Sequence, residues 1–171
     1  MRLRSYFIAL GSNLGDREAN LRDGWEMLSP ICRRMRISRL YETLPMYVER
    51  QPQYLNAVGE AFTSAAPLEM LDVLHSIERR LGRDRAREQR NGPRTLDLDI
   101  LLCGDAVIDT PGLTIPHPRL AERRFVLVPL LELSRSLRDP RTGERLGRAL
   151  ALLEAAQGAG GPGGVYLYRR R

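Results

Sequence analysis

Two aspartates interrupt an apolar run, LDLDILL, at residues 96–102. The run has the length and composition of a buried β-strand, yet aspartate is a poor strand former and is costly to bury. Because side chains alternate along a strand, Asp97 and Asp99 share one face, with Cα atoms roughly 6.5–7 Å apart. Two acids so close repel each other unless a cation sits between or beside them. The spacing suits two Mg²⁺ ions that share the phosphate oxygens of a substrate, although a solvent-facing strand with incidental acids has the same pattern.

Arginines lie on both sides of this strand in the sequence. Five stand in the segment RDRAREQRNGPR, and three more follow His117, which is held between two prolines. All 27 residues of the Lys and Arg total are arginine, which excludes a P-loop lysine, a Schiff-base lysine and a kinase-type strand lysine. The net charge of +6 favours a polyanionic partner, either nucleic acid or the phosphates of a small ligand. Acids for metal ions beside arginines for phosphates indicate phosphoryl transfer.

A second group of residues could bind the acceptor of the phosphoryl group. Tyr54 and Phe125 could stack on a flat heterocycle, and Asn56 can both donate and accept hydrogen bonds at a ring edge. His117 is stiffly held beside arginines, which favours a functional role as much as a structural one. Without further information, the two aromatic rings are explained more simply as core residues, and Asn56 equally well as a cap at a strand edge.

The hydrophobic pattern predicts the elements that must hold these residues. Strands are expected at 6–10, 31–41, 55–63 and 96–102, and helices at 16–28 and 67–81. The order strand, helix, strand, strand, helix, strand predicts an α+β fold. This fold is a ferredoxin-like βαββαβ antiparallel sheet with helices on one face and extra C-terminal helical segments. We expect one domain over residues 1–157 and a flexible, Gly-rich and basic tail over 158–171.

Two other classes of protein share parts of this pattern. RNA-binding modules also present a four-stranded sheet with a basic surface, but their sheets carry exposed aromatic residues, whereas Asp97 and Asp99 would repel a phosphate backbone. A palm-type nucleotidyl transferase also uses paired aspartates and two metals, and it stays open as an alternative. No apolar run approaches the ~20 residues of a membrane span, and the two cysteines lack metal-ligand spacing. We therefore expect a cytoplasmic protein without a nucleic-acid or membrane partner.

Four motifs together resemble those of the 6-hydroxymethyl-7,8-dihydropterin pyrophosphokinase family of folate biosynthesis. They are ALGSNLGD at 9–16, QPQYLNAV at 51–58, GPRTLDLDILL at 92–102 and IPHPRLAERRFVLVPL at 115–130. The motifs stand in the family's order. The resemblance implies transfer of a pyrophosphoryl group from ATP, the co-substrate, to the hydroxymethyl oxygen of a pterin, giving AMP and the pterin diphosphate. It also implies two Mg²⁺ ions that bridge the triphosphate, and a monomer whose partners are the small-molecule pterin and ATP.

The same resemblance assigns roles to individual residues. By analogy, the catalytic residues are Arg83, Arg94, Asp97 and Asp99, and the two aspartates hold the metal ions. The ATP-binding residues are Glu78, Arg85, Arg94, Ile100, Thr114, His117 and Arg123. The pterin-binding residues are Thr43, Leu44, Tyr54, Asn56, Asp97 and Phe125, with the two aromatic rings as a stacking pair. Asn91, Gly112 and Pro118 stand where some members have a tryptophan, an ATP-contacting arginine and a tyrosine. These departures concern loop contacts and nucleotide affinity rather than the reaction.

Nucleotide binding should require a divalent cation, because Asp97 and Asp99 would otherwise face a polyphosphate of the same sign. Calorimetric titration with a non-hydrolysable ATP analogue should therefore detect binding with Mg²⁺ and not after chelation. Equal affinities under the two conditions would refute the metal assignment. The same repulsion predicts that, in metal-free protein, asparagine at either position leaves the melting temperature level or raises it.

Overall fold

The computed structural model describes residues 2–44, 52–83, 92–157 and 164–169. Its elements, in chain order, are β1 (Arg4–Ser12), α1 (Arg17–Glu26), β2 (Arg34–Ile37), β3 (Tyr41–Thr43), β4 (Tyr54–Thr63), α2 (Pro67–Arg80), β5 (Asp97–Cys103), β6 (Ile108–Thr110), β7 (Leu113–Ile115), the 3₁₀-helix η1 (Leu120–Glu122), α3 (Arg124–Leu133), α4 (Leu146–Gln157) and β8 (Val165–Leu167). Within the described ranges, every helix is too short or too polar to cross a membrane.

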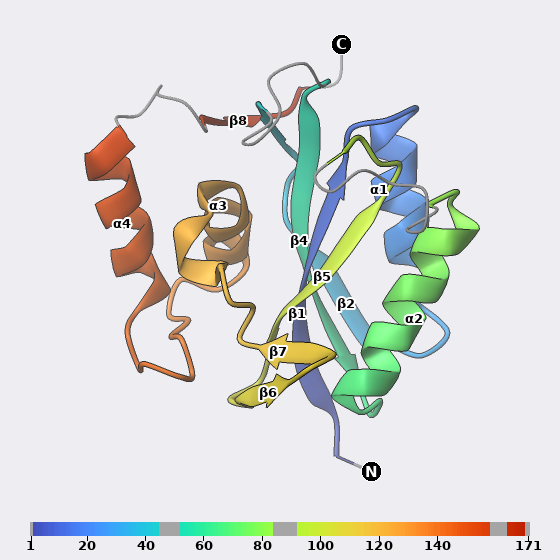
Figure 1. The fold of residues 1–171 in the computed structure, drawn as a ribbon, viewed down its shortest axis with the longest axis horizontal. Coiled ribbons are helices and arrows are strands. Elements are labelled where there is room, and N and C mark those ends of the chain that lie inside the picture. The colour runs from blue at the N-terminus through green and yellow to red at the C-terminus, as the bar shows by residue number, and fades with distance from the viewer. Residues whose placement is uncertain (1, 45–51, 84–91, 158–163, 170–171) are drawn as a thin grey trace.

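A six-stranded antiparallel sheet forms the centre of the molecule (Figure 1). Its strand order is β5-β1-β4-β3-β8, and β2 pairs with a different part of β4 than β3 does. The strand expected at 31–41 is therefore two strands. Ser38 separates them, because its Oγ accepts the Val58 N–H at 3.1 Å and so replaces a backbone carbonyl of the ladder.

Both expected helices form, with the ends that the sequence indicates. The carboxylate of Asp16 caps α1 by accepting the Ala19 N–H at 3.0 Å. Pro67 opens α2, where the missing N–H of proline costs nothing, and the chain turns at Gly82 with φ +87°, a conformation that favours glycine. The turn at Gly82 ends α2 and places Arg83 directly after it.

Each face of the sheet has its own apolar core. α1 and α2 cover one face, where Trp25, Leu74 and Leu98 belong to one buried cluster, and α3 covers the other, where Leu127 packs with Val58 (Figure 1). The helices α1 and α2 therefore share one face, as expected, and α3, one of the extra C-terminal helical segments, lies on the other. The physical reason is that α3 is apolar on most of its circumference, so it must be buried between the sheet and α4.

The segment expected to be a flexible tail contains a strand. β8 pairs antiparallel with β3, and the Tyr168 N–H donates to the Leu40 carbonyl at 2.9 Å. Residues 165–167 thus differ from the expectation, because the outer edge of β3 offers unpaired backbone groups that they satisfy. Residues 158–163 lie outside the described part, and the domain boundary at 157 stays a prediction.

Replacing Gly59 should destabilise the fold, because α1 packs its tryptophan directly on this glycine. A Cβ added at Gly59 would lie 2.2–2.7 Å from atoms of the Trp25 ring, which is itself 8% exposed. Relief of such an overlap costs roughly 1–3 kcal/mol, so Gly59→Ala should lower the free energy of unfolding by about that amount in urea titrations. Gly112→Ala is the matched control, since no atom lies within 4 Å of the added Cβ. Equal stability of the two variants would contradict this packing.

Candidate active site

Asp97 and Asp99 lie on the face of β5 that points away from the apolar core beneath α1 and α2, as their spacing predicts. Leu98 and Ile100 point into the cluster beneath α1 and α2, whereas the two aspartate side chains are 29% and 39% exposed. In the neighbouring strand Asp97 faces Gly11 and Asp99 faces Ala9. The predicted arrangement of a buried apolar face and an accessible acidic face is confirmed at this end of the strand.

The two carboxylates differ in their surroundings. Arg83 Nη1 lies 2.5 Å from Asp97 Oδ1, and Arg94 Nη1 lies 3.2 Å from Asp97 Oδ2. Burial acts to raise the pKa of Asp97, but the two guanidinium groups outweigh it and hold the pKa below its usual value. Asp99 has no guanidinium partner in close contact among the described residues, and burial together with the charge of Asp97 raises its pKa to about 6. Two guanidinium groups thus balance the charge of Asp97, whereas the pKa of Asp99 shows the effect of burial and of repulsion by its neighbour.

A buried glutamate holds Arg83 against the strand. Glu78, on the last turn of α2, is 1% exposed and hydrogen-bonds Arg83 Nη1. The same Glu78 oxygen accepts the Leu98 N–H at 2.8 Å, between the two aspartates. The structure thus places Glu78 beneath the acidic face, where it orients Arg83 and the backbone of β5.

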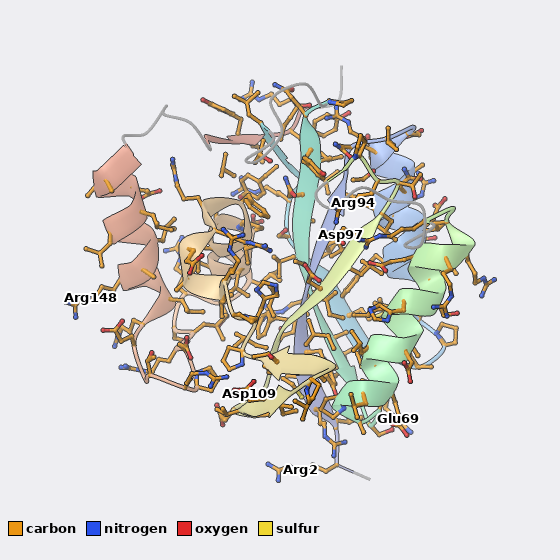
Figure 2. The ribbon with its side chains drawn as sticks, in the orientation of Figure 1. Arg2, Glu69, Arg94, Asp97, Asp109 and Arg148 are labelled. Carbon is orange, nitrogen blue, oxygen red and sulfur yellow. The ribbon has the colours of Figure 1, made fainter. Side chains whose placement is uncertain are left out.

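Arg94 is held from the other side by an asparagine that the sequence analysis did not single out. The Arg94 N–H donates to Asn13 Oδ1 at 2.8 Å, and the Asn13 N–H donates to the Arg94 carbonyl at 3.1 Å. Figure 2 shows Arg94 and Asp97 close together at the start of β5. The signal in the sequence was the GSN segment directly after an apolar strand, because a buried asparagine there needs backbone partners.

His117 presents a neutral N–H to the same face. Its backbone N–H donates to the Leu101 carbonyl at 2.9 Å, which fixes the turn beside β5. Its Nδ1 accepts the Arg119 N–H at 3.1 Å, so the ring proton belongs on Nε2, which lies 3.9 Å from Asp99 Oδ2. Burial, with Arg123 and Arg119 nearby, lowers the pKa of His117 to about 4. Next to it, Arg123 Nε is buried and has no hydrogen-bond partner among the described residues.

A group of polar side chains lies beside the aspartates on the same face. Asn56 Nδ2 donates to Thr43 Oγ1 at 2.8 Å, and Asn56 Oδ1 lies on the side of Gly11. A Cβ at Gly11 would lie 3.4 Å from Asn56 Oδ1, and 3.9 Å from both Asp97 Cβ and Tyr54 Cδ1. Gly11 therefore adds no side chain to the space between the Asn56 amide, the Tyr54 ring and the Asp97 carboxylate. Sequence reasoning missed Gly11, although a glycine inside a strand signals close approach of another group.

The remaining candidates are less closely joined to this site. Phe125 lies in the first turn of α3, with the Arg123 guanidinium 5.7 Å from its ring centroid. Thr114 lies on β7, with its Oγ1 3.5 Å from Asp109 Oδ1, and the side chain of Ile100 belongs to the first core. Leu44 is 50% exposed at the end of a described range, whereas Arg85 and Asn91 lie outside the described residues.

The two carboxylates fit a divalent cation by their chemistry. They present hard oxygen ligands on one accessible face, and a cation would offset both causes of the raised pKa of Asp99, its burial and the like charge of Asp97. Among the described residues, no three His, Cys, Asp or Glu side chains gather closely enough to hold a metal ion. A cation at this site would therefore take its other ligands from water or a substrate.

Comparison with known proteins gives consistent matches. The model of the family 7,8-dihydro-6-hydroxymethylpterin-pyrophosphokinase (HPPK) matches residues 7–135. The 2-amino-4-hydroxy-6-hydroxymethyldihydropteridine pyrophosphokinase of Bacillus subtilis is 46% identical over 80% of this chain and 81% of its own length. The protein of the same name from Pseudomonas aeruginosa is 41% identical over 87% of this chain and 91% of its own. A crystal structure of Plasmodium falciparum HPPK-DHPS has a similar fold, with a TM-score of 0.71 at 14% identity, over 90% of this chain and 43% of that one.

The different surroundings of the aspartates predict opposite effects on stability in metal-free protein. Asp99→Asn removes the repulsion and should raise the melting temperature at pH 7.5 by about 2–4 °C, for roughly 1 kcal/mol at a partly exposed site. Asp97→Asn should instead lower it by several degrees, because Arg83 and Arg94 lose their counter-charge. The sequence-based expectation of a level or raised melting temperature therefore stays a prediction for Asp99, and for Asp97 the two ion pairs lead us to predict the opposite.

The pH dependence of the melting temperature tests whether ionised Asp99 destabilises the folded protein. The folded-state pKa of Asp99 lies above its unfolded value, so the folded protein takes up the proton first as the pH falls. The penalty from Asp99 is therefore complete above pH 6, declines between pH 6 and about 4, and disappears below. The advantage of Asp99→Asn over the wild type in thermal melts should follow this course. An advantage that stayed constant from pH 7.5 to 4 would contradict the assignment.

Proposed function

This chain belongs to the 7,8-dihydro-6-hydroxymethylpterin-pyrophosphokinase family, and on that premise we propose that it acts at the face of the sheet that carries Asp97 and Asp99. The chain is an ATP-dependent diphosphotransferase of folate biosynthesis. It transfers the pyrophosphoryl group of ATP to the hydroxymethyl oxygen of 6-hydroxymethyl-7,8-dihydropterin. The products are AMP and the pterin diphosphate.

One observation supports this location above the others. Asp97, Gly11 and Asn56 lie in one row across β5, β1 and β4, so the carboxylate and the amide are two strand spacings, about 10 Å, apart. That span is comparable to the long dimension of a flat bicyclic ring, and Gly11 adds no side chain of its own to it. The row therefore joins a ring-binding group to a phosphate-transfer group on a single rigid surface.

At the pterin end, the residues orient the acceptor. Asn56, whose side chain is held by the bond to Thr43, accepts a hydrogen bond from the ring edge through Oδ1. Tyr54 borders Gly11, and Phe125, in the first turn of α3, would stack on the opposite face of the ring, as the family resemblance implies. The hydroxymethyl group is then directed toward Asp97. Holding the reacting oxygen in this way replaces a diffusional encounter by a fixed approach.

At the phosphate end, the chain supplies positive charge and rigid donors. Arg83 and Arg94 reach Asp97 from two directions, so both lie where a phosphate oxygen next to Asp97 would accept their N–H groups. The Nε2–H of neutral His117 is a further donor for a polyphosphate, and the guanidinium of Arg123 adds positive charge next to it. Magnesium ions, held by Asp97 and Asp99, supply the charge that offsets the triphosphate. We propose two such ions, as the family resemblance implies.

In the reaction, the hydroxymethyl oxygen forms a bond to the β-phosphorus of ATP. The bond between that phosphorus and the oxygen bridging to the α-phosphate breaks, AMP leaves, and the hydroxyl proton is released. Arg83 and Arg94 donate to oxygens on which negative charge is redistributed in the transition state. A planar guanidinium can bind two such oxygens at once, which a lysine cannot.

We also propose a ferredoxin-like arrangement of the sheet. It is supported by the order β5-β1-β4-β2, in which every neighbouring pair is antiparallel. The monomeric state, the cytoplasmic location and the lack of a nucleic-acid partner stay predictions.

The products of the reaction test the proposal. Incubation with ATP, Mg²⁺ and 6-hydroxymethyl-7,8-dihydropterin should release AMP in step with pterin diphosphate, which anion-exchange chromatography resolves from ADP and inorganic pyrophosphate. Release of pyrophosphate instead would indicate a nucleotidyl transferase. Asn56→Ala should weaken pterin binding and leave the affinity for an ATP analogue unchanged, because Asn56 lies at the pterin end. Arg94→Lys should instead lower turnover and leave the affinity for the pterin unchanged, because an ammonium group cannot replace the planar guanidinium in the transition state.

A further inference from the structure

The C-terminal strand β8 completes the sheet beside the pterin pocket. It pairs antiparallel with β3, and its register places Val165 opposite Thr43 and Leu167 opposite Tyr41. Figure 1 shows β8 at the end of the sheet where β4 begins. The strand lies outside residues 7–135, the part of the chain that the family model matches.

β3 is a three-residue strand that carries Thr43, the hydrogen-bond partner of the Asn56 side chain. Its last residue, Thr43, is 4% exposed and accepts the hydrogen bond from Asn56 Nδ2 that leaves Asn56 Oδ1 directed toward Gly11. Asn56 is itself 5% exposed. An amide turned by half a rotation would present a donor where the pocket now presents an acceptor. Because a hydroxyl can both donate and accept, Thr43 fixes the position of the Asn56 side chain rather than the choice between its two amide orientations.

Side chains tie β3 to the helices on both faces of the sheet. On one face Glu42 pairs with Arg17 Nη1 of α1 at 2.8 Å, and on the other the Tyr41 hydroxyl donates to Glu132 Oε2 of α3 at 2.6 Å. Neither contact restrains the outer backbone edge of β3. β8 supplies that restraint by a second ladder, which the bond from the Tyr168 N–H to the Leu40 carbonyl extends. A strand this short is prone to fraying when only one of its edges is paired.

We propose that β8 is a positioning element for the acceptor site, which holds β3 so that Thr43 keeps the Asn56 side chain in the position that binds the pterin. This inference rests on the proposed pterin site. It makes the last residues of the chain a determinant of acceptor affinity, although the structure gives them no place in the phosphate-binding half of the site. The residues that act here are Val165 to Tyr168 through their backbone, rather than through side chains that touch the pterin.

Two shortened chains test this role. The chain ending at residue 163 lacks β8, and the chain ending at Tyr168 keeps β8 but lacks the terminal arginines. With Mg²⁺ present, the first should bind 6-hydroxymethyl-7,8-dihydropterin about fivefold to tenfold more weakly, the factor expected for one lost neutral hydrogen bond, and an ATP analogue with unchanged affinity. The second should match the full chain for both ligands. An unchanged pterin affinity in the first chain, or equal losses for both ligands, would overturn the proposal.

A double-mutant cycle separates positioning from general loosening. Thr43→Val removes the acceptor for the Asn56 amide while keeping the shape of the side chain. If β8 acts through Thr43, removing β8 from the Thr43→Val chain should weaken pterin binding by less than twofold. Additive losses would show that β8 acts by another route and would overturn the proposal.

Backbone hydrogen exchange gives a readout that does not depend on the pterin. Removal of residues 164–171 should accelerate exchange at Tyr41–Thr43 at least tenfold and leave β1 and β5 protected. Unchanged exchange in β3 would refute the anchoring role. Failure of the full chain to bind pterin at all would instead refute the proposed function, so the two failures are distinguishable.

Discussion

The repulsion between two carboxylates on one strand face is the constraint on which the rest of the site depends. The structure does not spread the counter-charge evenly over the pair. Arg83 and Arg94 both bind Asp97, and Asp99 is left with a raised pKa beside a neutral histidine. Glu78 and Asn13, both buried, hold these arginines in turn, so each positive group has a second anchor away from the acidic face. The acid that keeps its repulsion is the position where an added positive charge would be most favourable.

The two apolar cores explain how the sheet stays stable although one of its faces carries two acids. The cluster beneath α1 and α2 takes the apolar residues of β5 that alternate with the aspartates, and the helix contacts are close enough that Trp25 covers Gly59 directly. On the other face, α3 and α4 bury only part of the surface, and the end near Asp97, Gly11 and Asn56 carries polar groups. Stability and chemistry are thereby assigned to opposite faces of the same strands. A rigid sheet also keeps the acceptor pocket at a fixed distance from the acids.

Arginine performs every basic role in this protein, and its geometry suits those roles. The guanidinium of Arg83 contacts Glu78 and Asp97 together, and that of Arg94 contacts Asp97 and the Gly92 carbonyl. Arg94 makes its two contacts through two nitrogens of one planar group, Nη1 and Nε, whereas an ammonium group has only one nitrogen. The same planar shape lets Arg123 lie near the ring of Phe125, which connects the phosphate and ring halves of the site.

The sequence by itself determined the elements whose signals are local. The Asp16 cap, Pro67, Gly82 and the alternation of acids in β5 specify their own boundaries and faces, because capping, φ preference and strand periodicity act within a few residues. The motifs, through their resemblance to a family, also indicated the reaction. Tertiary structure alone decided the features that need partners far along the chain. Only the fold could place α3 on the second face, pair β8 with β3, and bring Asn13 to Arg94 and Gly11 beneath Asn56, since these contacts join residues more than 40 positions apart. It likewise made Asp97 a partner of two arginines and left Asp99 with its charge unmatched, because charge compensation depends on distance in space and not on position in the sequence.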